Sequence, residues 1–193
     1  RDVLGSRGLG DVYKRQLFYV LGTWSLSYAV KVMKPPFSQN EYLAMQMVSV
    51  VFFAIFIFVT CIYSDKLGRK TVLISTTLAT LVFSLFAMQS LQHNVLTVML
   101  FLCVGFALMG GLFGPCGAYL PELFPTHVRY SGAGLSYNLA AILGGAFAPA
   151  ISTALVKSTG AVESVGWYLA VMSLLALIAL FLIKESKDED YEK

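Results

Sequence analysis

The sequence predicts an all-α membrane protein with six transmembrane helices. Of its 193 residues, 57% are hydrophobic and only 13% are charged, about half the charged fraction of a typical soluble domain. The charged residues stand between or at the ends of six long apolar runs, each near the roughly 20 residues that a helix needs to cross a bilayer. A membrane β-barrel would show short segments of alternating polarity, so the continuous runs indicate helices.

The six apolar runs cover residues 17–33, 42–63, 71–91, 95–119, 132–156 and 165–183. The second and third runs contain no Asp, Glu, Lys or Arg, and a short charged turn separates them. Pro121 and Pro125, which follow the fourth run, predict the end of that helix, because proline cannot continue the pattern of backbone hydrogen bonds.

The composition argues against a soluble enzyme, a metal protein and a nucleic-acid-binding protein. The basic residues are spread over the connections instead of forming one patch. Three cysteines lie within apolar runs and the two histidines stand apart, which favours core packing over a metal site, a disulfide or a catalytic cluster. We therefore expect no metal, no cofactor and no nucleic-acid partner.

The distribution of Lys and Arg predicts that both chain ends face the cytoplasm, where short basic loops are retained. Seven basic residues lie in the cytoplasmic connections of this topology and three in the opposite ones. The seven are Lys66, Arg69, Lys70, Arg129, Lys184, Lys187 and Lys193, and the three are Lys31, Lys34 and Lys157. Residues 186–193 form a charged cytoplasmic tail in this topology.

Residues 1–16, RDVLGSRGLGDVYKRQ, are polar and glycine-rich and lack the periodicity of the remaining chain. The string resembles the translation of a sequencing adapter. We therefore treat it as a non-native leader and exclude it from the fold prediction. A natural cytoplasmic linker, which would also be basic, is the alternative. The predicted bundle then spans residues 17–185.

Five polar or aromatic residues within the runs are candidates to line a substrate cavity. Trp24 and Tyr28 share one face of the first helix, Gln46 lies in the second, and Tyr137 and Asn138 form a polar pair in the fifth. Three of them have a structural alternative. Tyr28 can anchor the helix at the membrane interface, Gln46 is favoured for an interhelical hydrogen bond, and Asn138 can serve helix packing.

Small residues suggest where helices approach closely. Gly110 and Gly114 form a small-xxx-small pattern, and Pro115 next to them can bend the helix. Gly145 belongs to a stripe of small residues on the fifth run. Static packing is the favoured interpretation of these residues, and a hinge is the alternative.

Two segments carry a resemblance to a known family. The pattern D-K-x-G-R-K within residues 64–70 resembles the loop signature of the major facilitator superfamily. PELFPTHVRYSGAG resembles the connection between the tenth and eleventh helices of that family. Together with SYNLAAILGGAFAP, it is similar to the metabolite:proton symporter group, which includes shikimate, 2-oxoglutarate, citrate and proline/betaine carriers.

The resemblance implies that the chain is the C-terminal half of a twelve-helix carrier, whose N-terminal six-helix half is its missing partner. The first, second, fourth and fifth runs would then face a central cavity. The implied function is transport of a small polar metabolite across the bacterial inner membrane by alternating access, with proton symport expected. An uncoupled facilitator and a non-transporting scaffold or sensor are the alternatives.

Charges at the expected cytoplasmic side suggest a gate. Asp65, Arg69, Glu122 and Arg129 would form a latch that breaks when the two halves separate. Fixing the topology is the alternative role for the charges of this loop, above all for its lysines. No carboxylate lies inside a run, and no Lys or Arg lies in the middle of one. Residues 17–185 therefore contain no evident proton carrier and no evident site for an anion.

Overall fold

The computed structural model describes residues 13–33, 36–86, 88, 91, 94–122 and 129–182, with only the backbone of residues 116–122, 129, 136, 140 and 143. Most of the predicted leader and the whole predicted tail lie outside these residues. The first helix is described from residue 13, passes through the π-helical segment η1 (Val20–Trp24) and ends with α2 (Ser25–Lys31). Its described part includes four residues before the predicted run.

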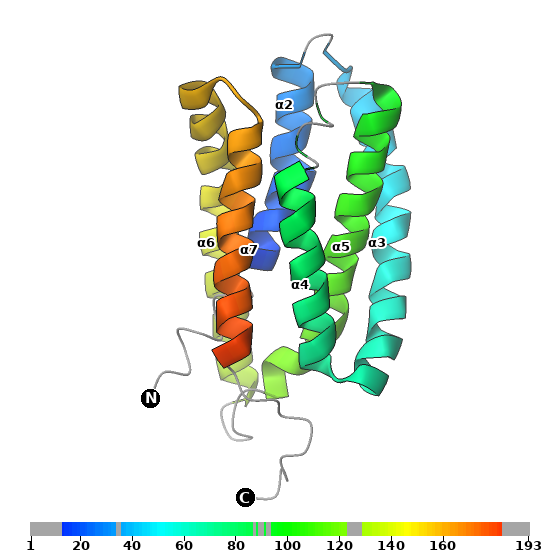
Figure 1. The fold of residues 1–193 in the computed structure, drawn as a ribbon, viewed down its shortest axis with the longest axis vertical. Helices are drawn as coiled ribbons and strands as arrows, with labels where there is room; N and C mark the ends of the chain where they lie inside the picture. The colour runs from blue at the N-terminus through cyan, green and yellow to red at the C-terminus, as the bar shows by residue number, and fades with distance from the viewer. Residues whose placement is uncertain are drawn as a thin grey trace, which may run out of the picture.

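Five longer helices follow: α3 (Gln39–Leu67), α4 (Arg69–Phe86), α5 (Val95–Glu122), α6 (Arg129–Thr159) and α7 (Glu163–Leu182). They lie side by side with the first helix along the long axis of the molecule (Figure 1). All five contain a stretch long and apolar enough to cross a membrane. With the bent first helix they make six, and the described residues contain no strand. The predicted all-α fold is confirmed.

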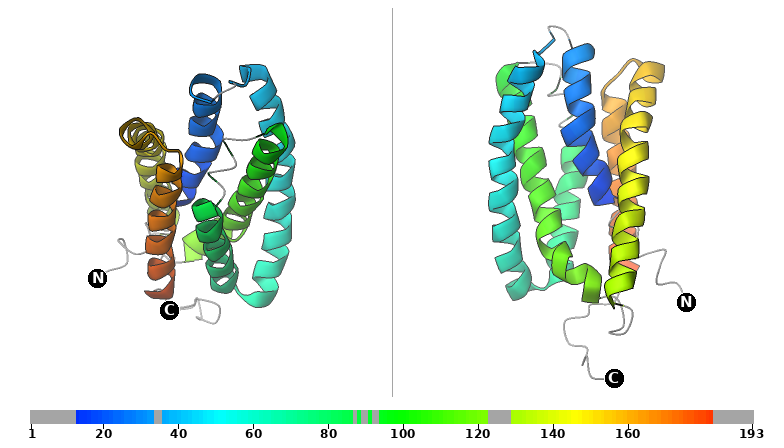
Figure 2. Two further views of the ribbon diagram at one scale, coloured as in Figure 1. Left: turned by 45° about the horizontal axis from the view of Figure 1, so that its top comes forward. Right: turned by 180° about the vertical axis from the view of Figure 1, so that it is seen from behind.

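Some helix ends differ from the predicted runs. α3 begins earlier because Ser38 caps it: its hydroxyl accepts from the Glu41 N–H at 3.2 Å, and the Glu41 carboxylate accepts from the Ser38 N–H at 3.0 Å. α5 continues past Pro121 to Glu122, and the second predicted stop, Pro125, lies outside the described residues. A proline within a membrane helix removes one hydrogen bond and can bend the helix without ending it. The last turns of α5 lean away from its earlier course (Figure 2).

The helices pack in an arrangement that places the first helix near the centre. α3 packs mainly on α5, and α4 packs on α7 and α5. The first helix contacts α3 through α2, and it contacts α6 and α5 through η1. Fully buried apolar side chains such as Leu21, Leu102 and Leu169 come from the first helix, α5 and α7 and form one core.

The turn between α3 and α4 depends on Gly68. This residue has φ 91° and ψ 139°, a backbone conformation that residues with a β-carbon rarely adopt. Its N–H donates to the Ser64 carbonyl at 3.1 Å, and the next helix begins at Arg69. The glycine of the charged signature therefore permits an immediate reversal of the chain.

Polar groups inside α4 satisfy their own helix. The hydroxyls of Thr76, Thr77 and Thr80 donate to carbonyls four residues earlier at 2.7–2.8 Å, and the Ser84 hydroxyl donates to the Leu81 carbonyl at 2.8 Å. Such bonds leave the helix surface with few unsatisfied polar atoms. α4 can therefore pack closely against its neighbours without the free-energy cost of burying unpaired polar groups.

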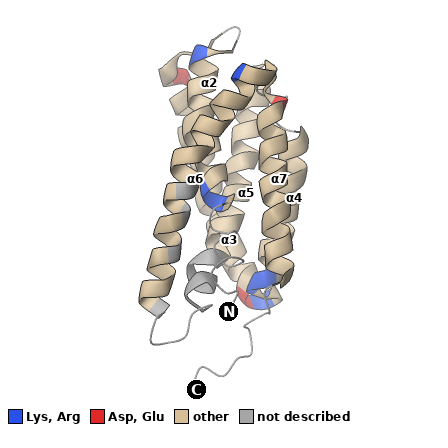
Figure 3. Cartoon of the chain, turned by 90° about the vertical axis from the view of Figure 1, so that its left-hand side faces the viewer, with Lys and Arg blue, Asp and Glu red and all other residues tan. Residues whose placement is uncertain are grey.

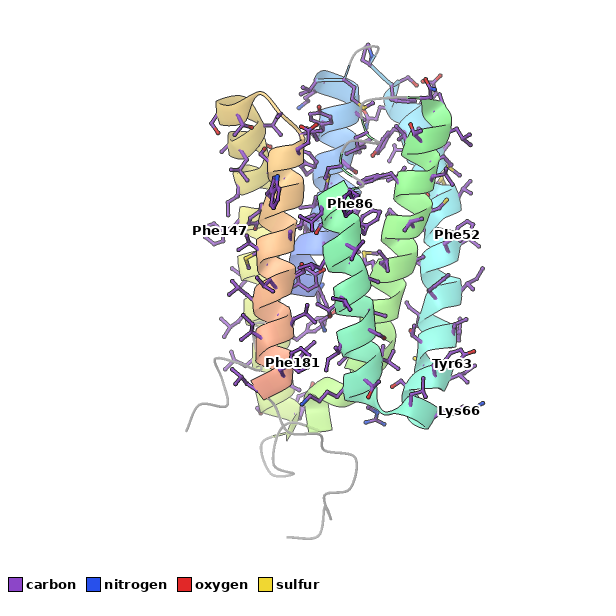
Figure 4. The ribbon with its side chains drawn as sticks, viewed as in Figure 1. Phe52, Tyr63, Lys66, Phe86, Phe147 and Phe181 are labelled. Carbon is purple, nitrogen blue, oxygen red and sulfur yellow. The ribbon has the colours of Figure 1, made fainter. Side chains whose placement is uncertain are left out.

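The outer surface of the bundle is apolar. Phe52, Phe86, Phe147 and Phe181 project from different helices (Figure 4), and each is 40–71% exposed. An apolar surface spread over so many helices would be unfavourable in water and suits a lipid environment.

Candidate functional site

Gln46 links α3 to the first helix. Its side-chain amide donates to the Leu21 carbonyl at 3.0 Å and to the Gly22 carbonyl at 2.9 Å. Gln46 is only 9% exposed, so its amide would be costly to bury without these acceptors. The structure thus gives this candidate cavity residue an interhelical hydrogen bond, the alternative that the sequence favoured.

The two carbonyls that Gln46 contacts belong to η1. In this segment the Ser25 N–H donates to the Val20 carbonyl, five residues earlier, whereas in an α-helix it would donate to the Leu21 carbonyl. The freed Leu21 oxygen accepts from the Ser25 hydroxyl as well as from Gln46. Side chains therefore replace the backbone donor that the π-helical geometry removes.

Trp24 and Tyr28 lie next to this contact, and the structure brings them together. Their ring centroids are 5.2 Å apart, with 24° between the ring planes. Trp24 is 3% exposed and Tyr28 is half-buried. The stack fixes both rings on one face of the first helix, one turn beyond the carbonyls that Gln46 holds.

Tyr137 and Asn138 lie apart from these three residues, on the exposed side of α6. The Asn138 amide donates to the Gly134 carbonyl of its own helix at 2.8 Å. Among the described residues, no hydrogen bond or ring contact joins either residue to Trp24, Tyr28 or Gln46. The five candidates thus form two groups, one at the contact between the first helix and α3 and one on α6.

Two basic side chains of the predicted leader, Lys14 and Arg15, lie inside the bundle. Figure 3 shows this basic segment about halfway along the molecule, away from the charged ends. The Arg15 guanidinium lies 3.9 Å from the Tyr137 ring centroid, and Lys14 Nζ lies 5.8 Å from the Phe113 ring centroid. Both distances fit cation–π contacts. The Lys-Arg-Gln string directly before the first apolar run was the signal that could have identified them.

A seam of small residues joins α5 to α3. A β-carbon on Gly110 would overlap the Phe53 carbonyl oxygen and lie 3.1 Å from the Phe56 Cβ. A β-carbon on Gly114 would overlap the Thr60 hydroxyl and lie 2.9 Å from the Ile57 carbonyl oxygen. The two backbones can approach this closely only because both positions are glycine.

Polar contacts accompany this seam. The Cys61 thiol donates to the Gly114 carbonyl at 3.3 Å, and the Ser49 hydroxyl lies 3.6 Å from the Cys103 sulfur. Pro115 follows Gly114 within the helix, and its side chain is buried. The other candidate glycine, Gly145, lies on α6, where a β-carbon would lie 2.6 Å from Cε2 of the Tyr19 ring.

The proposed gate residues occupy helix ends. Asp65 lies in the last turn of α3, and Arg69 begins α4 directly after the Gly68 turn. Glu122 is the last residue of α5 and Arg129 the first of α6, but their side chains lie outside the described ones. Figure 1 places the α3–α4 turn and these ends of α5 and α6 at the same end of the bundle.

The described residues contain no group of three or more His, Cys, Asp or Glu side chains that could hold a metal ion. The polar atoms of the candidate groups are instead amides, hydroxyls, aromatic rings and two cations. These groups can stack on a bound molecule and donate hydrogen bonds to it.

Comparison with known proteins identifies relatives along almost the whole chain. It is 40% identical over 185 residues to the inner membrane metabolite transport protein YhjE of Escherichia coli, covering 89% of this chain and 42% of that protein. It is also 40% identical over 184 residues to a putative metabolite transport protein of Haemophilus influenzae, covering 90% of this chain and 42% of the relative. The chain thus spans about two fifths of the length of these relatives.

A shorter match joins the chain to a citrate-proton symporter of Salmonella typhi, with 39% identity over 118 residues, 60% of this chain and 27% of the symporter. No solved structure matches the chain significantly. These named relatives are transport proteins rather than enzymes. The sequence pattern described as Major Facilitator Superfamily matches residues 16–193, and the chain therefore belongs to that superfamily.

Proposed function

We propose that the complete protein carries a small polar metabolite across the bacterial inner membrane by alternating access, and that this chain is its C-terminal half. The observation that carries the proposal is the 40% identity to an inner membrane metabolite transport protein over 89% of this chain. Because the chain covers 42% of that relative, a second six-helix half remains to be supplied by the rest of the protein.

The packing of the bundle supports a place for that second half. In α3 and α6, only 17% and 19% of the most apolar membrane-spanning stretch is buried inside the bundle, compared with 56% in α5 and 50% in α7. Part of the exposed surface would face lipid and part would face the other half. Tyr137 and Asn138 lie on the exposed side of α6, where they could line the shared cavity.

Of the three candidates near the contact between the first helix and α3, Tyr28 is the one with open surface, because Trp24 and Gln46 are buried in this conformation. We propose that Tyr28, Tyr137 and Asn138 contact the transported molecule. Trp24 and Gln46 would then support the first helix.

We further propose that the end of the bundle with the α3–α4 turn faces the cytoplasm. There, Asp65, Arg69, Glu122 and Arg129 would join the two halves in the outward-facing state. A single exposed ion pair contributes only about 0–1 kcal/mol. Several such pairs together could bias two states that differ by a few kcal/mol.

Proton coupling is the finer part of the proposal. Its support is the similarity to a citrate-proton symporter over 60% of this chain. No Asp or Glu lies within the described membrane helices away from their end turns. A proton carrier, in this proposal, belongs to the other half of the protein.

The test is uptake of labelled citrate, 2-oxoglutarate, shikimate and betaine into proteoliposomes that contain the complete carrier. Accumulation of one compound only under an inward proton gradient would support symport and identify a substrate. Equilibration without accumulation would indicate an uncoupled facilitator. Absence of uptake by folded protein would count against transport of these four compounds, and would favour another substrate or the scaffold role.

A further inference from the structure

The π-helical segment η1 is the feature of the bundle that the proposed function leaves unexplained. It is the one π-helical segment in the described part of the chain. Short π-helical segments occur frequently at functional sites, because they interrupt the regular hydrogen-bond pattern of a helix. Here the interruption lies between the buried Leu21 and the Trp24–Tyr28 stack.

The hydrogen bonds around η1 define two mutually exclusive patterns. In the observed pattern, the Ser25 N–H donates to the Val20 carbonyl and the Gln46 amide donates to the Leu21 carbonyl. In a regular α-helix, the Ser25 N–H would return to the Leu21 carbonyl and compete with Gln46 for it. The Leu21 carbonyl already accepts from the Ser25 hydroxyl and from Gln46, so the Ser25 N–H would have to displace one of these two donors.

We propose that Val20–Trp24 is a two-state switch in the register of the first membrane helix, and that Gln46 is the positioning residue that holds its π form. The purpose of the switch rests on the proposed transport function, since a carrier must move between two access states. The switch itself is a property of the backbone and of one amide, so it can be tested without a substrate.

The geometry predicts what the switch would move. Conversion from π to α removes one residue from a wide turn and rotates one part of the helix relative to the other by about 100°. Trp24 lies at the boundary, buried and stacked on Tyr28. Rotation would carry this pair from its present position. Gly22 has no heavy atom within 4 Å of the place a β-carbon would take, so a methyl group can be added there without meeting a neighbour.

The experiment is fluorine NMR of the complete carrier labelled with 5-fluorotryptophan. The Trp24 resonance is assigned by its loss in Trp24→Phe. In Gln46→Leu, and in Gln46→Met, which preserves length but has no donor, we expect a second Trp24 resonance to gain population by about tenfold. Loss of one to two net hydrogen bonds shifts an equilibrium by that order. Gly22→Ala should act in the same direction, because alanine favours the α-helix and meets no neighbour.

Ser49→Ala is the matched control. Ser49 lies one turn after Gln46, and its hydroxyl donates to the Met45 carbonyl of its own helix at 2.8 Å, away from η1. The Trp24 resonance should remain at its original position in this variant. A single unchanged resonance in folded Gln46→Leu, or an equal shift in Ser49→Ala, would overturn the proposal. If the Gln46 variants do not fold, an unchanged resonance in Gly22→Ala would overturn it instead.

The two proposals fail in different ways. Absence of uptake by the unmodified carrier would count against the transport function while leaving the NMR result readable. A Trp24 resonance that is unchanged in the Gln46 and Gly22 variants would contradict the switch proposal. It would have no bearing on the proposed transport function, which the uptake assay tests.

Discussion

Gly110→Ala should separate α5 from α3. The added methyl group would overlap the Phe53 carbonyl oxygen and lie 3.1 Å from the Phe56 Cβ. The Phe53 oxygen is part of the helix backbone, so it cannot rotate away as a side chain can. The two helices would have to part by roughly 1 Å to restore ordinary contact distances.

Two effects of opposite sign determine the size of this change. Overpacking a close interface costs about 1–3 kcal/mol, whereas alanine is more favourable than glycine in a helix by about 1 kcal/mol. Because the clash is with backbone, we expect the upper part of the overpacking range and a net loss of about 1–2 kcal/mol. Gly134→Ala is the control, because no heavy atom lies within 4 Å of its β-carbon position and only the helix gain remains.

The assay is thermal unfolding of the complete carrier in detergent, with both variants measured beside the unmodified protein. Each kcal/mol shifts Tm by about 2–4 °C in a domain of this size. Gly110→Ala should therefore unfold several degrees below Gly134→Ala. Equal Tm values for the two variants would show that the α3–α5 approach is not limited by Gly110 and would refute the reasoning.

Three further predictions concern the α3–α4 turn and the basic segment of the first helix. Gly68→Ala should lower Tm by a few degrees, because a β-carbon at φ 91° costs about 1–2 kcal/mol; an unchanged Tm would mean that the turn adopts another conformation. Asp65→Asn should slow uptake and increase the labelling of cysteines placed at the cytoplasmic end. If the uptake rate and the labelling are both unchanged, the proposed latch is wrong. Lys14→Ala should lower Tm by a few degrees, because it removes the contact of Lys14 Nζ with the Phe113 ring and the buried stem of the side chain. An unchanged Tm would show that Lys14 adds nothing to the stability of the bundle.

The number and order of the helices could be predicted because charge-free runs of sufficient length have few alternatives in a membrane. The π-helical segment could not be predicted from the sequence. Its sequence, Val-Leu-Gly-Thr-Trp, contains no proline, and the hydrogen bonds that hold it come from Gln46, which lies on another helix. The sequence singled out Gln46 as a polar residue in an apolar run but carried no signal for which carbonyls it would contact.

The candidate site was predictable only in part for similar reasons. Helical spacing correctly placed Trp24 and Tyr28 on one face, because they are four residues apart. It carried no information on how far α6 lies from that face, so the separation of Tyr137 and Asn138 from the other candidates required the tertiary structure. Their contact with a transported molecule, like the roles of the gate residues, stays a prediction.

The different bonding of α3 and α4 has a consequence for the substitutions that each helix can accept. Hydroxyls on α4 bond to their own helix, so valine, which has the shape of threonine, could replace the threonines while preserving the surface that the neighbours touch. On α3, Gln46 and Cys61 bond across to other helices, and a residue of equal size without a donor would remove that bond between helices. Random mutagenesis of the complete carrier should therefore find α4 constrained by side-chain volume and α3 by side-chain chemistry.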